Sequence, residues 1–130
     1  MKKSKRTKKS NAWKIRQHRD PYFKKSKTLG YRSRASFKLI ELNKKYRFIK
    51  KNSNLLDLGS CPGGWSQVAS KIITNGKILS IDIKDMEPIN NVKFVKADIL
   101  QNDTTIHIRT LTQTDTTPLN SIHICTKSLN

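Results

Sequence analysis

Hydrophobic and polar positions follow two different periods between residues 33 and 98, and each period predicts its own kind of element. Over residues 33–46 apolar side chains recur every three or four positions, which is the spacing of one helix face. Four residues share that face: Ala35, Leu39, Leu42 and Tyr46. Ser33 is the expected N-cap, because a serine side chain accepts a hydrogen bond from the first free N–H groups of a helix.

A strand, a glycine-rich turn and a helix follow in that order. Residues 54–58 form a short apolar run before Gly59, as in a strand that is buried on both faces. The pattern over residues 65–73 predicts a helix, and residues 77–83 and 92–97 predict a second and a third strand. A βαβ unit has parallel strands and a right-handed crossover, so we expect an α/β fold with about three parallel strands.

The pattern changes after residue 103. Residues 103–130 contain eight threonines, whereas residues 1–102 contain three, and the segment has no helical apolar stripe. Two short runs, residues 106–108 and 122–124, are candidate strands, but the sequence does not decide for either. We therefore divide the chain into a basic arm over residues 1–32, an α/β unit over residues 33–102 and a Thr-rich, atypical tail over residues 103–130.

Positive charge is concentrated in the first part of the chain. Of the formal net charge of +18, residues 1–50 carry +17, because 19 Lys and Arg side chains stand there against Asp20 and Glu41. We expect residues 1–12 to form a disordered tail and residues 13–32 to form a short helix and a loop. In the second segment, aromatic residues are mixed with the cations. This mixture favours binding to nucleic acid, with docking on the core, an anionic membrane or plain solubility as alternatives.

Several other classes of protein fit the sequence poorly. Cys61 and Cys125 lie far apart and form no C-x-x-C pair, so neither a metal site nor a disulfide framework is indicated. No apolar run approaches the ~20 residues of a membrane span, and the cationic N-terminus lacks the apolar segment of a signal peptide. We therefore expect a cytoplasmic protein that makes no membrane contact.

Glycines and carboxylates gather at the predicted carboxyl ends of the strands, where parallel sheets bind ligands. These residues are Asp57, Gly59, Asp82 and Asp98. The turn departs from G-x-G-x-x-G and contains no Gly-Lys-Ser/Thr, which disfavours a dinucleotide oxidoreductase and excludes a Walker-type phosphate site. At its strand end, Asp82 can accept hydrogen bonds from both hydroxyls of a ribose. Asp98, after the third strand, can accept a hydrogen bond from an adenine amino group. Each residue alone has a plain explanation as a turn or cap, but their order and spacing favour a ligand site.

Two motifs carry a resemblance to a known family. The segment Asp57-Leu-Gly-Ser-Cys-Pro-Gly-Gly-Trp-Ser-Gln67 follows Tyr31-Arg-Ser-Arg-Ala-Ser-Phe-Lys-Leu39, and Asp82-x-x-x-Met86-x-Pro88 comes after both. Together they resemble the FtsJ/RrmJ family of ribosomal RNA large subunit methyltransferases, from about Trp13 to Asp98. The resemblance implies the N-terminal half of a Rossmann-like, S-adenosylmethionine-dependent methyltransferase fold.

The same resemblance implies a reaction and a set of site residues. It implies a monomer that uses S-adenosylmethionine to methylate a uridine 2′-hydroxyl of large-subunit (23S) ribosomal RNA in the 50S particle. By family position, Gly63, Trp65, Asp82 and Asp98 are expected to bind the cofactor. Lys38 is expected to be the first lysine of the Lys-Asp-Lys-Glu set around the target hydroxyl, with an ordinary surface lysine as the alternative. A nearby cation favours a deprotonated hydroxyl, and in-line positioning supplies much of the rate.

The sequence departs from the family after the third strand. The family continues with a Ser-Asp-x-x-Pro strand end, a second lysine and a glutamate, and none of these motifs is present. Asp115 and Lys127 follow no predicted strand, so neither receives a catalytic role. We therefore expect a truncated, impaired copy whose tail arises from a frameshift and whose sheet lacks partners on one side. The alternative is a non-catalytic, basic RNA-binding fragment.

Overall fold

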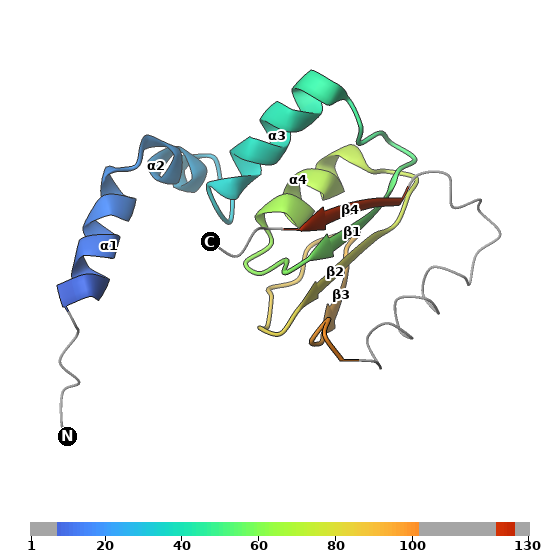
Figure 1. The fold of residues 1–130 in the computed structure, drawn as a ribbon. Helices are drawn as coiled ribbons and strands as arrows, with labels where there is room; N and C mark the ends of the chain where they lie inside the picture. The colour runs from blue at the N-terminus through green and yellow to red at the C-terminus, as the bar shows by residue number, and fades with distance from the viewer. Residues whose placement is uncertain (1–7, 102–121, 127–130) are drawn as a thin grey trace.

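A computed structural model gives the fold of residues 8–101 and 122–126 (Figure 1). Within these ranges the elements are, in chain order, α1 (Lys8–Arg19), α2 (Pro21–Thr28), α3 (Ala35–Tyr46), β1 (Asn54–Leu58), α4 (Gly64–Ile72), β2 (Ile78–Asp82), β3 (Lys93–Lys96) and β4 (Ile122–Thr126). The helices and strands predicted from periodicity between residues 33 and 97 are all present, with ends shifted by one or two residues.

The strands form one sheet in the order β3-β2-β1-β4, in which every neighbouring pair is parallel. Leu56 of β1 lies opposite Leu79 of β2 on one side and Ile124 of β4 on the other. The expected α/β class and the parallel β1–α4–β2 unit are therefore confirmed. Residues Leu55 to Asp57 of β1 are all buried, which explains why this strand has a continuous apolar run rather than an alternating pattern.

The fourth strand, β4, lies next to β1. The expectation that the sheet would have no partner strand on that side is therefore wrong. The bounds of β4, Ile122–Thr126, enclose one of the two candidate strands of the tail; the other, at residues 106–108, lies outside the described residues. A five-residue strand is stabilised by backbone hydrogen bonds to a neighbour far away in the sequence. Local periodicity carries no signal of that neighbour, so the sequence alone did not decide for the strand.

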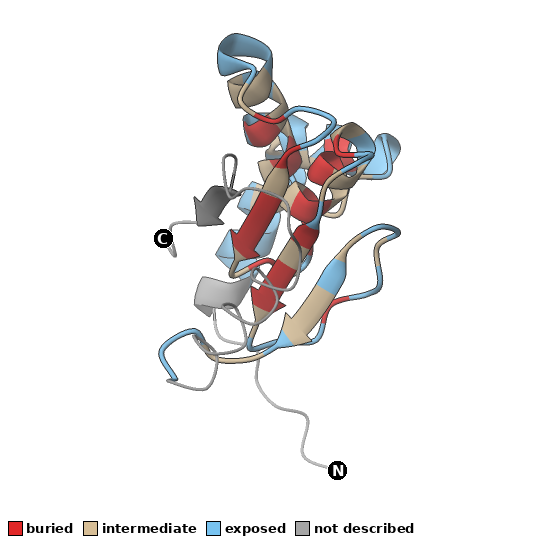
Figure 2. Cartoon of the chain, turned by 90° about the vertical axis from the view of Figure 1, so that its right-hand side faces the viewer, coloured by how far each residue is buried: buried red, intermediate tan, exposed pale blue. Residues whose placement is uncertain are grey.

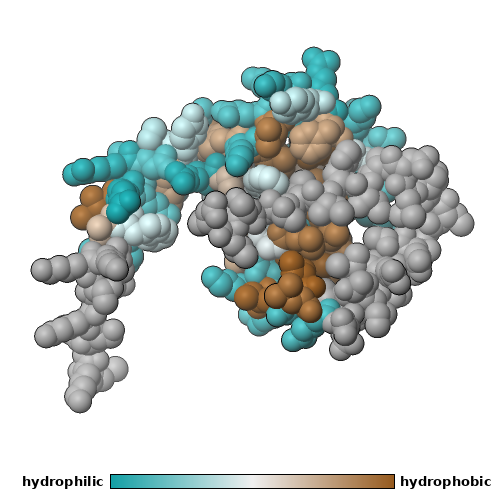
Figure 3. Space-filling view, viewed as in Figure 1, coloured by the Kyte–Doolittle hydropathy of each residue, from teal (hydrophilic) through white to brown (hydrophobic). Residues whose placement is uncertain are grey.

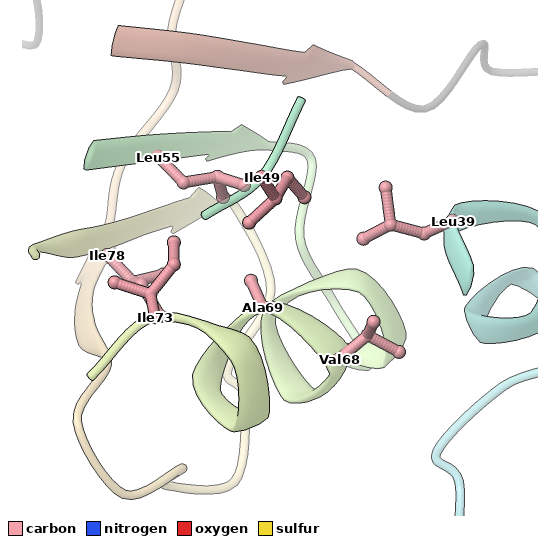
Figure 4. Close-up of a cluster of buried hydrophobic side chains, with 7 residues drawn as sticks. All are labelled: Leu39, Ile49, Leu55, Val68, Ala69, Ile73 and Ile78. Atoms are coloured by element: carbon pink, nitrogen blue, oxygen red, sulfur yellow. The ribbon is translucent and has the colours of Figure 1, made fainter. Parts of the chain in front are cut away.

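One hydrophobic core joins the helices to the sheet. α4 packs against β1 and β2, and α3 packs against α4 (Figures 1 and 4). The core cluster consists of Leu39, Ile49, Leu55, Val68, Ala69, Ile73 and Ile78. Figure 2 shows buried residues concentrated in β1, β2 and α4. Full burial of each large aliphatic side chain is worth about 1.5–3 kcal/mol, so this cluster holds α3 and α4 on one face of the sheet.

The predicted cap of α3 at Ser33 is wrong. The helix begins at Ala35, and its N-cap is Arg34, whose side chain makes no capping hydrogen bond. Arg34 already has helical backbone angles (φ −62°, ψ −23°), so the chain enters the helix without a serine cap. The Ser33 hydroxyl is instead buried beside Gly64 at the start of α4.

The described part of the basic arm, residues 8–32, contains two helices rather than the one short helix and loop that the sequence predicted, and the first begins at Lys8, inside the segment expected to be disordered. Asp20 ends the first helix and caps the second, because its Oδ1 accepts a hydrogen bond from the Tyr22 N–H at 2.9 Å. Pro21 follows at the first helical position, where its missing N–H costs nothing. α2 contacts α3, whereas α1 contacts α2 and extends away from the sheet (Figure 1).

Aromatic contacts and one ion pair attach α2 to α3. The Phe37 ring lies 6.0 Å from that of Tyr22 and 5.4 Å from that of Tyr31, measured between centroids. The Arg34 guanidinium pairs with the Asp20 carboxylate. Burial alone raises the pKa of Asp20, but hydrogen bonds from Arg34 and from backbone N–H groups outweigh it, so the pKa lies below its ordinary value of 3.8.

In the part of the chain that the structure describes, no helix has the length and apolar character needed to cross a membrane.

The Asp20 contact makes the attachment of the arm dependent on pH. Because the lowered pKa belongs to an anion that is stabilised in the fold, the stabilisation is complete above pH 3.8 and is lost as the pH falls through the lowered pKa. We expect the amide resonance of Tyr22 to titrate with a midpoint below 3.8 in an NMR pH series. Asp20→Asn is the control, because it keeps the capping oxygen and abolishes the titration. A wild-type midpoint at or above 3.8 contradicts the attachment.

Candidate functional site

The turn after β1 brings the backbone close to the loop that follows β2. We call residues 59–63 the glycine turn and residues 83–92 the β2 loop. Gly63 is buried and has a φ of +108°, a conformation that favours glycine. A Cβ at this position would lie 2.9 Å from the Met86 Sδ and 3.0 Å from the Ile89 Cδ1 of the β2 loop. The predicted site residue Gly63 is therefore required by both backbone conformation and space.

Asp82 ties the end of β2 to the glycine turn. Its Oδ2 accepts a hydrogen bond from the Cys61 N–H at 2.8 Å, and its Oδ1 accepts one from the Lys84 N–H at 2.9 Å. The residue is half-buried. A carboxylate has about four acceptor positions, so these two bonds leave capacity for ligand hydroxyls. The predicted site residue therefore stands at the end of β2, fixed in direction and with acceptors to spare.

Asp98 lies after β3, at the same edge of the sheet as Asp82. The Ala97 N–H donates to the Asp82 carbonyl at 3.0 Å. The pairing of β2 with the chain after β3 therefore continues one residue beyond the end of β3. The Asp98 Oδ1 accepts a hydrogen bond from the Leu100 N–H at 2.9 Å, so the carboxylate stabilises the turn that follows. The structure thus brings Asp82, Asp98 and the glycine turn together at the carboxyl ends of the strands.

Asp57, which we expected beside the other carboxylates, is instead part of the contact between α4 and the sheet. It is fully buried, and its Oδ2 accepts a hydrogen bond from the Ser66 Oγ of α4 at 2.6 Å. The hydroxyls of Ser66 and Ser80 are also 2.6 Å apart. Alternation along β1 turns this side chain toward α4, where it fastens the helix to the sheet instead of facing a ligand.

Trp65 anchors α3 to the start of α4. Its indole Nε1–H donates to the Ala35 carbonyl at 2.8 Å, and its ring packs against the core. Ser36 adds a buried hydrogen bond from its Oγ to the Gly64 carbonyl at 3.1 Å. The two motifs that the sequence marked as separate therefore interlock, and the cofactor contact expected of Trp65 stays a prediction.

Lys38 projects from α3 one turn after the residue that Trp65 anchors. Its side chain is exposed. Because Ala35 is fixed by the indole N–H and Leu39 is fully buried in the core, the rotation of α3 about its axis is set on both sides of Lys38. The point on α3 from which the Lys38 side chain extends is therefore fixed, and its ammonium group faces solvent, where it can meet an anionic ligand.

Two residues of the site were not singled out by sequence reasoning. Arg32 donates to main-chain carbonyls of both the glycine turn and the β2 loop, and the Gln67 side chain holds the main chain on either side of Tyr31. Both residues lie within the two quoted motifs, but nothing local distinguishes an arginine that bonds to carbonyls from one that binds phosphate. Among the residues that the structure describes, no group of three or more His, Cys, Asp or Glu is arranged to hold a metal ion.

The arm presents a mostly hydrophilic, cationic surface beside the site. Figure 3 shows hydrophilic side chains along the arm and over α3. Exposed apolar rings lie among them, with Trp13 60% and Tyr22 51% exposed. Lys71 lies 4.6 Å from the ring centroid of Tyr31 and Lys25 lies 5.3 Å from that of Phe37, so some cations are held over aromatic faces.

A parallel sheet with a glycine turn and acidic residues at the carboxyl ends of its strands is the arrangement of a Rossmann-like α/β domain. Residues 31–126 match the model of the FtsJ-like methyltransferase family, a range that includes β4. The chain therefore belongs to the FtsJ-like methyltransferase family.

Relatives and a solved structure agree with this assignment. The chain is 46% identical over 106 residues to the ribosomal RNA large subunit methyltransferase E of Rickettsia canadensis, covering 77% of this chain and 47% of the relative. The protein of the same name from Rickettsia akari is 45% identical with the same coverage. A crystal structure described as a ribosomal RNA methyltransferase of Plasmodium falciparum matches with a TM-score of 0.54 and 40% identity, over 62% of this chain and 49% of that one. The chain thus spans about half the length of these relatives.

The interlock at Gly64 predicts a specific steric coupling. A Cβ on Gly64 would collide with the Ser33 Oγ and would lie 2.8 Å from the Ser36 Oγ. We expect Gly64→Ala to destabilise the fold by about 1–3 kcal/mol, the usual cost of overpacking, in chemical denaturation. Adding Ser33→Ala removes the closest contact and leaves the Ser33 Cβ at 3.4 Å, so the double variant should recover part of the loss. Strict additivity of the two substitutions would show that Ser33 does not contact residue 64.

Proposed function

We propose that this chain is the N-terminal half of an S-adenosylmethionine-dependent enzyme that methylates a uridine 2′-hydroxyl of large-subunit ribosomal RNA. The observation that carries the proposal is the interlock of the two motifs. The hydrogen bond from Trp65 to Ala35 fixes the start of α4, which directly follows the glycine turn, against the helix that bears Lys38. A cofactor turn and a cation on the helix packed next to it are parts that methyl transfer to a poorly acidic hydroxyl needs.

The site residues fit the proposed cofactor by their chemistry. S-Adenosylmethionine supplies an electrophilic methyl group bonded to a sulfonium sulfur. We infer that Gly63 and Trp65 line its binding site. We also infer that Asp82 accepts hydrogen bonds from the ribose hydroxyls and that Asp98 accepts one from the adenine amino group. The hydrogen bond that joins Asp82 to the glycine turn and the spare acceptor positions of Asp82 support these roles.

Lys38 has the proposed catalytic role on the RNA side. An ammonium group near the ribose hydroxyl lowers the free energy of its alkoxide form and so lowers the pKa of the hydroxyl. The exposure of Lys38 and the fixed rotation of α3 support this role. The family's second lysine and its glutamate have no counterpart in the sequence, so this chain alone would be an impaired enzyme.

The partner is proposed to be large-subunit ribosomal RNA in the 50S particle. The Rickettsia relatives are named for that RNA, and residues 1–50 of this chain carry a net charge of +17, which attracts a polyanion. We further propose that the protein is cytoplasmic and monomeric, and that residues 1–32, 33–102 and 103–130 act as arm, cofactor-binding half and tail.

A second function is favoured by the same charge distribution. A chain that spans about half of its relatives, with an arm of this charge, can bind RNA without completing the methyl transfer. Binding of this kind depends strongly on salt, because each neutralised phosphate releases counterions. Affinity for RNA without transfer of a methyl group is the property that separates this function from the first.

Methyl transfer and cofactor binding test the proposal directly. We expect calorimetric titration of the full chain to show S-adenosylmethionine binding, and labelled cofactor to transfer its methyl group to 50S particles slowly. Lys38→Ala should lower the transfer rate by about 100-fold or more, the usual cost of removing a group that stabilises developing negative charge. Cofactor affinity should change little, because Lys38 acts on the RNA side.

The control is Lys44→Ala, which removes an exposed cation near the end of the same helix. It should leave the transfer rate nearly unchanged. Cofactor binding together with salt-sensitive RNA binding, but without transfer, would favour the RNA-binding function. A chain that does not bind S-adenosylmethionine at all would rule out the enzymatic function.

A further inference from the structure

Arg32 bonds to three main-chain carbonyls from two different loops. Its Nη1 donates to the Glu87 carbonyl at 2.6 Å and to the Pro62 carbonyl at 3.3 Å, and its Nη2 donates to the Pro88 carbonyl at 2.8 Å. Pro62 belongs to the glycine turn, whereas Glu87 and Pro88 belong to the β2 loop. One guanidinium therefore joins the glycine turn, which contains Gly63 of the proposed cofactor site, to the loop that directly follows Asp82.

The main chain next to Arg32 is itself held in place. The Arg32 N–H donates to the Gln67 Oε1 at 3.0 Å, and the Gln67 Nε2 donates to the Gly30 carbonyl at 2.9 Å. Gln67 is part of α4, which is fixed to the sheet by the core. The Arg32 side chain thus starts from an anchored backbone, so its position is determined at both ends.

The guanidinium lies close to Gly63 of the glycine turn. A Cβ on Gly63 would lie 3.3 Å from the Arg32 Nη1, the same atom that bonds to Glu87 and Pro62. Hydrogen bonds from a charged donor are about twice as strong as neutral ones, and the planar fork of arginine fits several carbonyls at once. A lysine has a single donor nitrogen, so it cannot present the second nitrogen of the fork, which bonds to Pro88.

We propose that Arg32 is a positioning residue that sets the glycine turn and the β2 loop at the separation the cofactor requires. This inference rests on the proposed function, and it gives Arg32 a role different from that of the surrounding cations. Because its hydrogen bonds go to carbonyls of the protein, Arg32 acts on cofactor affinity and is not a phosphate contact of the arm.

Arg34 provides a matched control in the same motif. Its side chain is 66% exposed and pairs with Asp20 of the arm, outside both loops. Arg32→Ala and Arg34→Ala each remove one positive charge, two residues apart. A difference between the two variants therefore reports on the position of the guanidinium and not on net charge.

The test combines cofactor titration with hydrogen exchange on the full chain. In Arg32→Ala we expect S-adenosylmethionine to bind about tenfold or more weakly, the effect of losing charged hydrogen bonds. Backbone amides of the glycine turn and the β2 loop should exchange faster together, without cofactor present. Arg32→Lys should restore neither property fully, and Arg34→Ala should change neither.

A chemical rescue separates positioning from general damage to the fold. Low-millimolar methylguanidinium can occupy the space left in Arg32→Ala, and we expect it to recover cofactor affinity there but to have no effect on Arg34→Ala. If Arg32→Ala binds the cofactor as the wild type does, or loses RNA affinity alone, the inference is wrong.

The exchange measurement keeps this inference distinct from the proposed function. If the wild type fails to bind S-adenosylmethionine, the proposed function fails and the cofactor role of Arg32 fails with it. Faster exchange of both loops in Arg32→Ala would then still establish the contact between them. Unchanged exchange in both loops, with or without cofactor binding, would overturn the inference by itself.

Discussion

The arrangement of the site depends on the close approach of α3 and α4 at a residue without a side chain. At Gly64 the space that a Cβ would need is taken by the hydroxyls of Ser33 and Ser36. This closeness allows Ser36 to bond to the Gly64 carbonyl and Trp65 to bond to the Ala35 carbonyl. Each hydrogen bond contributes only about 1 kcal/mol net, so their importance is in direction more than in energy. They set how α3 is rotated, and the rotation sets where the following turn of the helix points.

A buried polar network gives α4 a similar fixed position over the sheet. Burying the Asp57 carboxylate is costly unless it is hydrogen-bonded, and the Ser66 hydroxyl supplies one such bond while also meeting Ser80 of β2. Apolar contacts alone tolerate small shifts of a helix along its axis, because they have little directional preference. The serine and aspartate network favours one register of α4 on β1 and β2. The glycine turn joins β1 to α4, so its two ends are fixed when α4 is fixed on the sheet.

The sequence was a good guide to elements and strand ends, and a poor guide to contacts between distant segments. Periodicity located α3, α4 and the first three strands, and the rule for parallel sheets located Asp82 and Asp98 correctly. Arg32 could not be assigned, because its partners lie 30, 55 and 56 positions away. The burial of Asp57 was missed because a strand end that is fully covered by a helix has the same sequence pattern as one that faces a ligand. In both cases the deciding information is tertiary.

The position of β4 beside β1 affects how firmly the sheet is held at the end that carries the proposed cofactor site. β1 pairs with β2 on one side and β4 on the other, so the glycine turn begins at a strand whose backbone is bonded on both sides. β2, which ends at Asp82, also has a neighbour on each side. β3 is shorter and, within the described residues, pairs only with β2. Asp98 therefore follows a less constrained strand than Asp82 does. The ribose end of the proposed site is set by the centre of the sheet, and the adenine end by its edge.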